Sequence, residues 1–246
     1  MSELASESTD TAPVRSTSEI RLACLDMAGT TVADDGLVLA AFSAALDALR
    51  VTEPAERERM TAYVVDTMGE SKITVFRALF PGDEEAAQEG NAAFESAYGA
   101  RVELTRALPG AVEAFAALRE EGVAVALTTG FSRATADALL EHLGWHRLVD
   151  LSLTPGDVGG RGRPHPDMIL AAAARLADGE PRAVAVLGDT ASDIRSGLAA
   201  GAPIVAGVLT GAHDHATLTA AGATRVLGHV AEFPDLLREH ARPHHP

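Results

Sequence analysis

Four short, almost continuously apolar segments recur along the chain, and each is followed by a turn that contains glycine or polar residues. These segments are residues 20–25, 123–128, 183–187 and 203–208. Strands that are apolar along their whole length are typical of a parallel sheet covered by helices on both faces. Amphipathic stretches that predict helices separate the segments, at residues 109–121, 133–143, 167–177 and 194–200. We therefore expect an α/β fold, a doubly wound parallel sheet in a Rossmann-like core.

The stretch from residue 36 to residue 105 interrupts this alternation, because it contains no convincing strand. Its apolar residues recur with helical spacing over residues 37–49, 54–67, 73–79 and 84–97. The first strand precedes these helices and needs the later strands to complete its sheet. We therefore expect an inserted α-helical cap, residues 36–105, within a catalytic core formed by residues 19–35 and 106–240.

The two ends of the chain and its net charge narrow the class of protein. Residues 1–18 are polar and predict a disordered leader, and residues 241–246 predict a loose tail. The net charge of -15 argues against a nucleic-acid partner, since phosphate backbones need a basic surface. No apolar run is long enough to span a membrane, and the N-terminus lacks the pattern of a signal peptide. We expect a cytoplasmic protein.

Polar residues gather where the predicted strands end. In a doubly wound sheet, ligands bind at the carboxyl ends of the strands. The residues that follow the strands or precede a helix there share the chemistry of phosphoryl transfer, and they are Asp26, Thr129, Gly130, Arg163, Asp189 and Asp193.

A carboxylate such as that of Asp26 can attack phosphorus and form an aspartyl-phosphate. It approaches an anionic phosphoryl group only if the charge is neutralised. Mg²⁺ held by Asp26 and Asp189 would supply part of this neutralisation, because Mg²⁺ favours sparse carboxylate sites. Arg163 and N–H groups of the turns would supply the rest.

The ordered series resembles the haloacid dehalogenase-like (HAD) hydrolase superfamily in four motifs. They are DMAGTT from Asp26, LTTG from Leu127, GRP from Gly162 and GDTASDI from Gly188. The resemblance implies that Asp26 is the nucleophile and that Mg²⁺ is the cofactor. It also implies further site residues, namely Thr129 and Arg163 for catalysis, Ala28, Gly29, Thr30 and Gly130 for substrate binding, and Asp26, the Ala28 carbonyl, Asp189 and Asp193 for the metal.

Ala28 distinguishes this chain from most phosphatases of the superfamily, which carry a second aspartate two residues after the nucleophile. That aspartate protonates the departing alkoxide. Loss of such an acid typically removes about 10²–10⁴ in rate. We therefore expect a substrate whose leaving group needs no acid at this position.

The segment TMGESKITVFRAL, residues 67–79, resembles the cap motif of the phosphonoacetaldehyde hydrolases, or phosphonatases. Met68 and Lys72 fall in register with it, which implies substrate binding and catalysis. In those enzymes the matching lysine forms a Schiff base with the substrate aldehyde, and the protonated imine accepts electrons as the C–P bond breaks. A free lysine has a pKa of about 10.4, so burial would have to lower the pKa of Lys72 by roughly 3 near neutral pH. Val75 and Phe131 stand where the phosphonatases carry a histidine and a tyrosine.

Two functions stay open. The first is Mg²⁺-dependent cleavage of the C–P bond of a small phosphonate aldehyde or ketone, such as phosphonoacetaldehyde, with Lys72 as the imine-forming amine. The alternative is a phosphate-monoester phosphatase in which Lys72 only forms a salt bridge and Glu70 or Tyr63 donates the proton. A dehalogenase needs no metal, so the presence of Asp189 and Asp193 disfavours it. A catalytically idle protein would have lost Asp26 or Asp189, and both are present. The expected partners are a small phosphonate or phosphate substrate, no nucleic acid, no membrane, and a second copy bound through the cap.

Overall fold

The computed structural model describes residues 20–242. The predicted leader of residues 1–18 lies outside the described residues, as do residues 243–246 of the predicted tail. Within residues 20–242, no helix combines the length and the apolar character that crossing a membrane would require.

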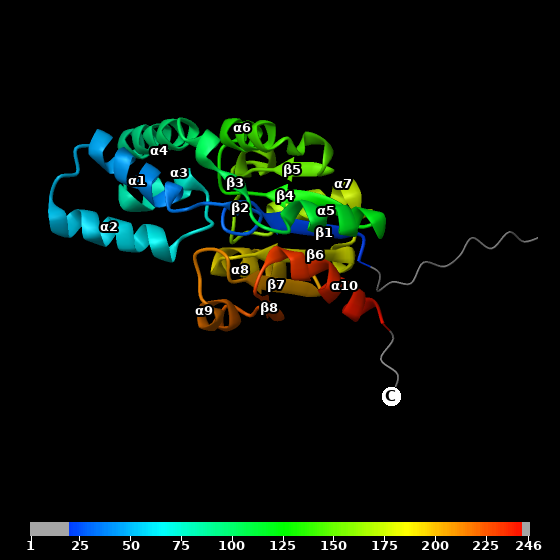
Figure 1. The fold of residues 1–246 in the computed structure, drawn as a ribbon. Coiled ribbons are helices and arrows are strands. Elements are labelled where there is room, and N and C mark those ends of the chain that lie inside the picture. The colour runs from blue at the N-terminus through cyan, green and yellow to red at the C-terminus, as the bar shows by residue number, and fades with distance from the viewer. Residues whose placement is uncertain (1–19, 243–246) are drawn as a thin grey trace, which may run out of the picture.

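A six-stranded parallel sheet forms the centre of the protein, with the strand order β5-β4-β1-β6-β7-β8 (Figure 1). Its strands are β1 (Leu22–Asp26), β4 (Ala124–Thr128), β5 (Leu151–Leu153), β6 (Val184–Gly188), β7 (Ile204–Val208) and β8 (Arg225–Leu227). The chain builds the sheet outward from β1 in one direction and then in the other, so β1 lies at the switch point of a doubly wound sheet. The predicted α/β class is confirmed. The sequence prediction missed β5 and β8, which have three residues each.

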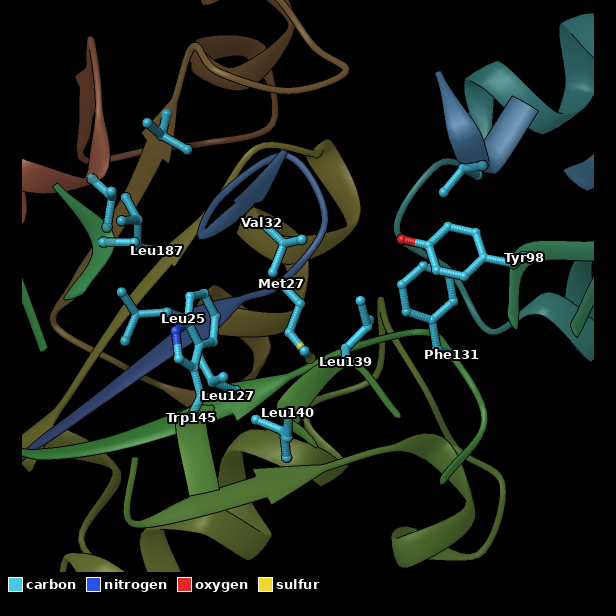
Figure 2. Close-up of a cluster of buried hydrophobic side chains, with 14 of the residues drawn as sticks. Leu25, Met27, Val32, Tyr98, Leu127, Phe131, Leu139, Leu140, Trp145 and Leu187 are labelled. Atoms are coloured by element: carbon cyan, nitrogen blue, oxygen red, sulfur yellow. The ribbon is translucent and has the colours of Figure 1, made fainter. Parts of the chain in front are cut away.

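Helices cover both faces of the sheet, which explains why its strands are apolar throughout. In β1, Leu25 joins the hydrophobic cluster on one face and Cys24 joins the cluster on the other. Figure 2 shows the first cluster, in which Leu25 and Leu127 lie near Trp145. The helices that cover this face of the sheet and contribute to the first cluster are α5 (Ala111–Glu120), α6 (Arg133–Leu143) and α10 (Phe233–Ala241), and the cluster continues into residues 38–98. Those on the opposite face are α7 (Asp167–Leu176), α8 (Ala191–Ala200) and α9 (His215–Ala220).

Four further helices form a separate group to one side of the sheet, on the left in Figure 1. They are α1 (Leu37–Ala48), α2 (Pro54–Asp66), α3 (Lys72–Leu79) and α4 (Glu84–Gly99). The rings of Phe42, Phe76 and Phe94 pack at their centre, with 4.7 Å between the centroids of Phe42 and Phe94. The chain enters and leaves this group through β2 (Val32–Ala33) and β3 (Arg106–Ala107), which pair antiparallel. We call the four helices the cap, and the residue limits predicted for the domains stay a prediction.

Candidate active site

The carboxyl ends of the central strands and the cap enclose a cavity of about 320 Å³. β1 ends at Asp26, which is paired with Thr128 at the end of β4, so both loops begin at the same level of the sheet. Most of the residues predicted from the sequence line this cavity, namely Asp26, Ala28, Gly29, Met68, Lys72, Thr129, Gly130, Arg163 and Asp189. Two predicted residues lie behind the cavity wall. Thr30 donates a hydrogen bond from its hydroxyl to Asp189 Oδ1 at 2.9 Å, and Asp193 pairs with Arg163.

Three buried carboxylates lie together beneath the cavity. Oxygen atoms of Asp26, Asp189 and Asp193 all fall within 4.8 Å of one another. Burial raises the pKa of Asp189 well above its ordinary value, and the negative charges of Asp26 and Asp193 raise it further. A Cβ atom at Gly29 would lie 2.5 Å from Asp189 Oδ2, so the turn after β1 closes tightly over this carboxylate. Crowded, buried carboxylates of this kind fit a divalent cation, which neutralises their repulsion.

Arg163 supplies a fixed positive charge between two of these carboxylates. Its Nη2 donates to Asp26 Oδ1 at 2.5 Å, and its Nη1 donates to Asp193. Burial raises the pKa of Asp26 to about 6, and Arg163 opposes this rise. The guanidinium therefore helps to keep Asp26 ionised at neutral pH, which is the form that can attack phosphorus.

Lys72, the first residue of α3, carries the amine that faces this carboxylate cluster from the cap. Its side chain is buried, with an exposed fraction of 6% for the residue. Nζ lies 5.8 Å from the ring centroids of Phe42 and Phe94 and 5.4 Å from that of Phe131. No carboxylate among residues 20–242 forms an ion pair with it. Burial, assisted by the charge of Arg163, lowers the pKa of Lys72 to about 8, so a minor fraction of the amine is neutral near physiological pH.

Two glycines allow the cap to lie against the core at this point. Gly69 has φ +87°, and a Cβ atom there would collide with Oγ1 of Thr190, which follows β6. A Cβ atom at Gly130 would collide with the backbone oxygen of Glu70. The N–H of Lys72 donates to the Gly130 oxygen at 3.4 Å. This close approach of the two backbones brings Lys72 into the same cavity as Asp26.

The arrangement is matched by a known family. The family model of the haloacid dehalogenase-like hydrolases matches residues 20–201. The chain belongs to this family.

Individual relatives of this HAD-like hydrolase include two that match much of its length. A phosphonoacetaldehyde hydrolase of Bacteroides fragilis is 31% identical over 180 residues, 63% of this chain and 68% of the relative. The probable phosphatase IndB of Dickeya dadantii is 31% identical over 204 residues, 81% of this chain and 86% of the relative. A bifunctional riboflavin kinase/FMN phosphatase of Arabidopsis thaliana is 32% identical over 119 residues, but the match spans only 31% of that protein's length.

Solved structures agree with the fold of this HAD-like hydrolase. A hydrolase from Pseudomonas syringae superposes with a TM-score of 0.76 at 26% identity, over 89% of this chain and 98% of the other. A phosphonoacetaldehyde hydrolase like protein from Oleispira antarctica gives 0.77 at 24% identity, over 96% and 99%, which shows the fold alone. The predicted superfamily, and the predicted resemblance to phosphonoacetaldehyde hydrolases, are confirmed.

The cap residues that the sequence proposed as proton donors do not line the cavity of this HAD-like hydrolase. Neither Glu70 nor Tyr63 is among the residues that line it, and Tyr63 is 37% exposed. Val75, which replaces the histidine of the phosphonatases, is buried among apolar side chains. Phe131 packs on Tyr98 with 4.5 Å between ring centroids, and Figure 2 shows the two rings side by side.

Sequence reasoning missed three titratable cavity residues of the HAD-like hydrolase. Asp34, Asp35 and Arg106 lie where the chain passes between core and cap, and all three line the cavity. Burial raises the pKa of Asp34 above its ordinary value. The sequence Asp34-Asp35-Gly36 is typical of a turn before a helix, which concealed any other role. A signal for Lys72 was also overlooked, since it is the only lysine in the chain and every other Lys or Arg position is arginine.

Proposed function

We propose that this hydrolase cleaves the C–P bond of a small phosphonate aldehyde or ketone, of which phosphonoacetaldehyde is the simplest candidate. The observation that carries the proposal is the buried amine of Lys72, which shares a cavity with Asp26 and has no ion pair within residues 20–242. A lysine used only to attract a phosphate would keep its charge. An amine that loses part of its charge to burial is suited to attack a carbonyl.

Asp26 and its neighbours supply the phosphoryl half of the reaction. Asp26 attacks phosphorus while Arg163 balances the negative charge. The Thr129 hydroxyl accepts a hydrogen bond from the Phe131 N–H at 3.2 Å, which leaves its own proton available for a phosphoryl oxygen. Mg²⁺ fits the carboxylates of Asp26, Asp189 and Asp193 with the Ala28 carbonyl, and when bound it supplies positive charge that screens the phosphoryl group.

Lys72 supplies the carbonyl half. Its neutral amine condenses with the substrate carbonyl and releases water, which leaves a protonated imine on Nζ. As the Asp26 oxygen bonds to phosphorus, the electron pair of the C–P bond moves to the carbon and the imine becomes a neutral enamine. No alkoxide departs, which accounts for Ala28 at the position where other family members carry an acid.

The alternative, a phosphate-monoester phosphatase, is favoured by one observation. The relative named a probable phosphatase matches 81% of this chain. In that case the cavity would have to supply a proton to the leaving alkoxide, since Ala28 has none to give. The cytoplasmic location and the homodimer through the cap stay predictions under either function.

Borohydride reduction in the presence of phosphonoacetaldehyde distinguishes C–P bond cleavage through an imine from phosphate-monoester hydrolysis. Because Lys72 is the only lysine, a reduced adduct on its peptide identifies the imine without ambiguity. We expect irreversible inactivation, one adduct on Lys72, and no adduct in Lys72→Arg. Phosphate release from a panel of phosphate esters is the comparison. Rapid turnover of esters by Lys72→Arg, with no borohydride sensitivity in the wild type, would replace the C–P reaction by the phosphatase.

A further inference from the structure

Imine formation at Lys72 needs a group that moves protons between the amine and the carbonyl oxygen. The amine must lose protons, and the carbonyl oxygen must gain two before it leaves as water. Val75 occupies the place of the histidine that the phosphonatases carry in this turn, and it cannot titrate. A proton-transfer group must therefore come from another part of the cavity wall.

The cavity wall offers few candidates. Its titratable residues are Asp26, Asp34, Asp35, Lys72, Arg106, Arg163 and Asp189. The carboxylates of Asp26 and Asp189 belong to the phosphoryl and metal cluster, and the two guanidinium groups keep their protons. Asp35 is exposed and forms an ion pair with Arg106. Asp34 remains.

Asp34 lies on the linker between β2 and α1, where the chain passes from the core into the cap. Its carboxylate accepts the Val38 N–H at 3.1 Å, and no side chain within residues 20–242 donates a hydrogen bond to it. Hydrogen bonding at a helix N-terminus ordinarily lowers the pKa of a carboxylate. Burial outweighs this effect and raises the pKa of Asp34, which makes the group a better proton acceptor.

We propose that Asp34 is the proton-transfer residue of the Lys72 site. This inference rests on the proposed function, in which Lys72 forms an imine. Because Asp34 and Lys72 form no direct ion pair, a bridging water relays each proton between them. Asp34 first takes a proton from the Lys72 ammonium through this water, the free amine bonds to the carbonyl carbon, and Asp34 returns the proton to the carbonyl oxygen. Asp34 then takes a second proton from the nitrogen and gives it to the hydroxyl, which leaves as water. The products are a protonated imine, one water molecule and the Asp34 carboxylate, so one carboxylate serves both transfers.

The charges around the pair are compatible with this exchange. Lys72 lowers the pKa of Asp34, and Asp34 raises that of Lys72, so the two charges act on each other across the cavity. Asp35 and Arg106 lie on the same linkers and form an ion pair with each other. Burial raises the pKa of Tyr98 on α4, and the charge of Asp34 raises it further. The pair reacts when it holds one proton in total. The wild-type rate of imine formation should therefore fall above about pH 8, where Lys72 loses that proton.

The variant Asp34→Asn separates proton transfer from helix capping. Its amide oxygen can still accept the Val38 N–H, but the side chain no longer exchanges protons. Asp35→Asn is the matched control, because Asp35 is the adjacent carboxylate on the same linker. Each protein is mixed with phosphonoacetaldehyde and quenched with borohydride at increasing times, and the adduct on the Lys72 peptide is quantified. The measurement is repeated between pH 6 and pH 10.

We expect Asp34→Asn to slow imine formation about 10²-fold or more, with less than about threefold change in Asp35→Asn. The pH profile should also change shape, since the variant needs Lys72 to be neutral on its own and its rate should rise with pH to a plateau. A wild-type rate and profile in Asp34→Asn would overturn the role of Asp34 while the Lys72 adduct still supports the proposed function. A wild type with no adduct at all would remove both. If Asp34→Asn does not fold, Asp34→Ser retains a capping oxygen and gives the same comparison.

Discussion

The core and the cap each contribute buried ionisable groups to one cavity, but the surroundings of these groups differ. In the core, the carboxylates of Asp26 and Asp193 are bonded to Arg163, and Asp189 accepts hydrogen bonds from Thr30 and the Ala212 N–H. In the cap, Lys72 Nζ lies among three phenylalanine rings. Polar and charged groups therefore surround the buried carboxylates of the core, whereas aromatic rings surround the buried amine of the cap.

This difference separates two chemical tasks. The core site suits an ionic partner, because the carboxylates of Asp26, Asp189 and Asp193 and the guanidinium of Arg163 lie together there. The cap site suits a carbonyl group, because burial lowers the pKa of its amine to about 8 and aromatic rings enclose it. A substrate that has a phosphoryl group at one end and a carbonyl at the other matches both halves of the cavity.

Asp26→Asn should produce the largest effect and act on the core alone. Without the proposed nucleophile, phosphate release should fall about 10⁴-fold or more. Imine formation on Lys72 should continue, because the cap chemistry does not use Asp26, and borohydride should still give an adduct. The two halves would prove inseparable if the variant lost the adduct together with phosphate release while its circular dichroism stayed that of the wild type.

Lys72→Met tests what the buried amine costs the fold. The pKa of Lys72 is about 8 in the folded protein and 10.5 ordinarily, so between these values the unfolded chain binds more protons and stability rises with pH. Below about pH 8 the folded wild type carries the full free-energy cost of burying the charged Lys72 ammonium. Lys72→Met should therefore be more stable at pH 7 by about 3 kcal/mol. The gain should shrink toward pH 10.5 in urea unfolding. Arg77→Met on the same helix is the exposed control, and an equal gain there would refute a cost specific to Lys72.

The core was easier to predict from sequence than the cavity. Continuous apolar strands predicted that Asp26 and Asp189 lie where β1 and β6 end, and the structure has them there, because a parallel sheet aligns the carboxyl ends of its strands. The strands β5 and β8 escaped prediction since three residues show no periodicity, and pairing with longer neighbours makes them strands. Helix limits differed by only a few residues.

The cap half of the cavity depends on tertiary contacts that no local pattern reveals. The environment of Lys72 comes from Phe42 on α1, Phe94 on α4 and Phe131 after β4, which are distant in sequence. The proposed chemistry requires a lowered pKa for Lys72, but the sequence alone does not show whether the pKa is lowered. Asp34 escaped notice for the same reason, because only the path of the linker places it on the cavity wall.

Mg²⁺ should stabilise the core without affecting the cap. Burial raises the pKa of Asp26 to about 6, so without a cation the folded state binds more protons than the unfolded state between pH 3.8 and 6, and stability falls as the pH rises. Mg²⁺ at about 100 times its Kd should add about 2.7 kcal/mol at pH 7. Asp189→Asn should abolish this gain. Calorimetry that finds the same Mg²⁺-dependent shift in Tm in that variant would place the metal elsewhere.

Gly69→Ala should give the smallest effect, and it acts on the contact between the two regions. A Cβ atom there meets Thr190 of the core, while the φ of +87° adds local strain. Gly82→Ala is the matched control, since Gly82 lies in the cap with φ +84° and a Cβ atom there would meet nothing within 4 Å. Both variants should lose about 1 kcal/mol of stability from strain. Only Gly69→Ala should also lower kcat/KM, by about tenfold, because a displacement of about 1 Å between Lys72 and Asp26 disturbs the geometry in which one substrate meets both. Equal kinetics in the two variants would show that the cap and core need not touch at Gly69 for the reaction to proceed.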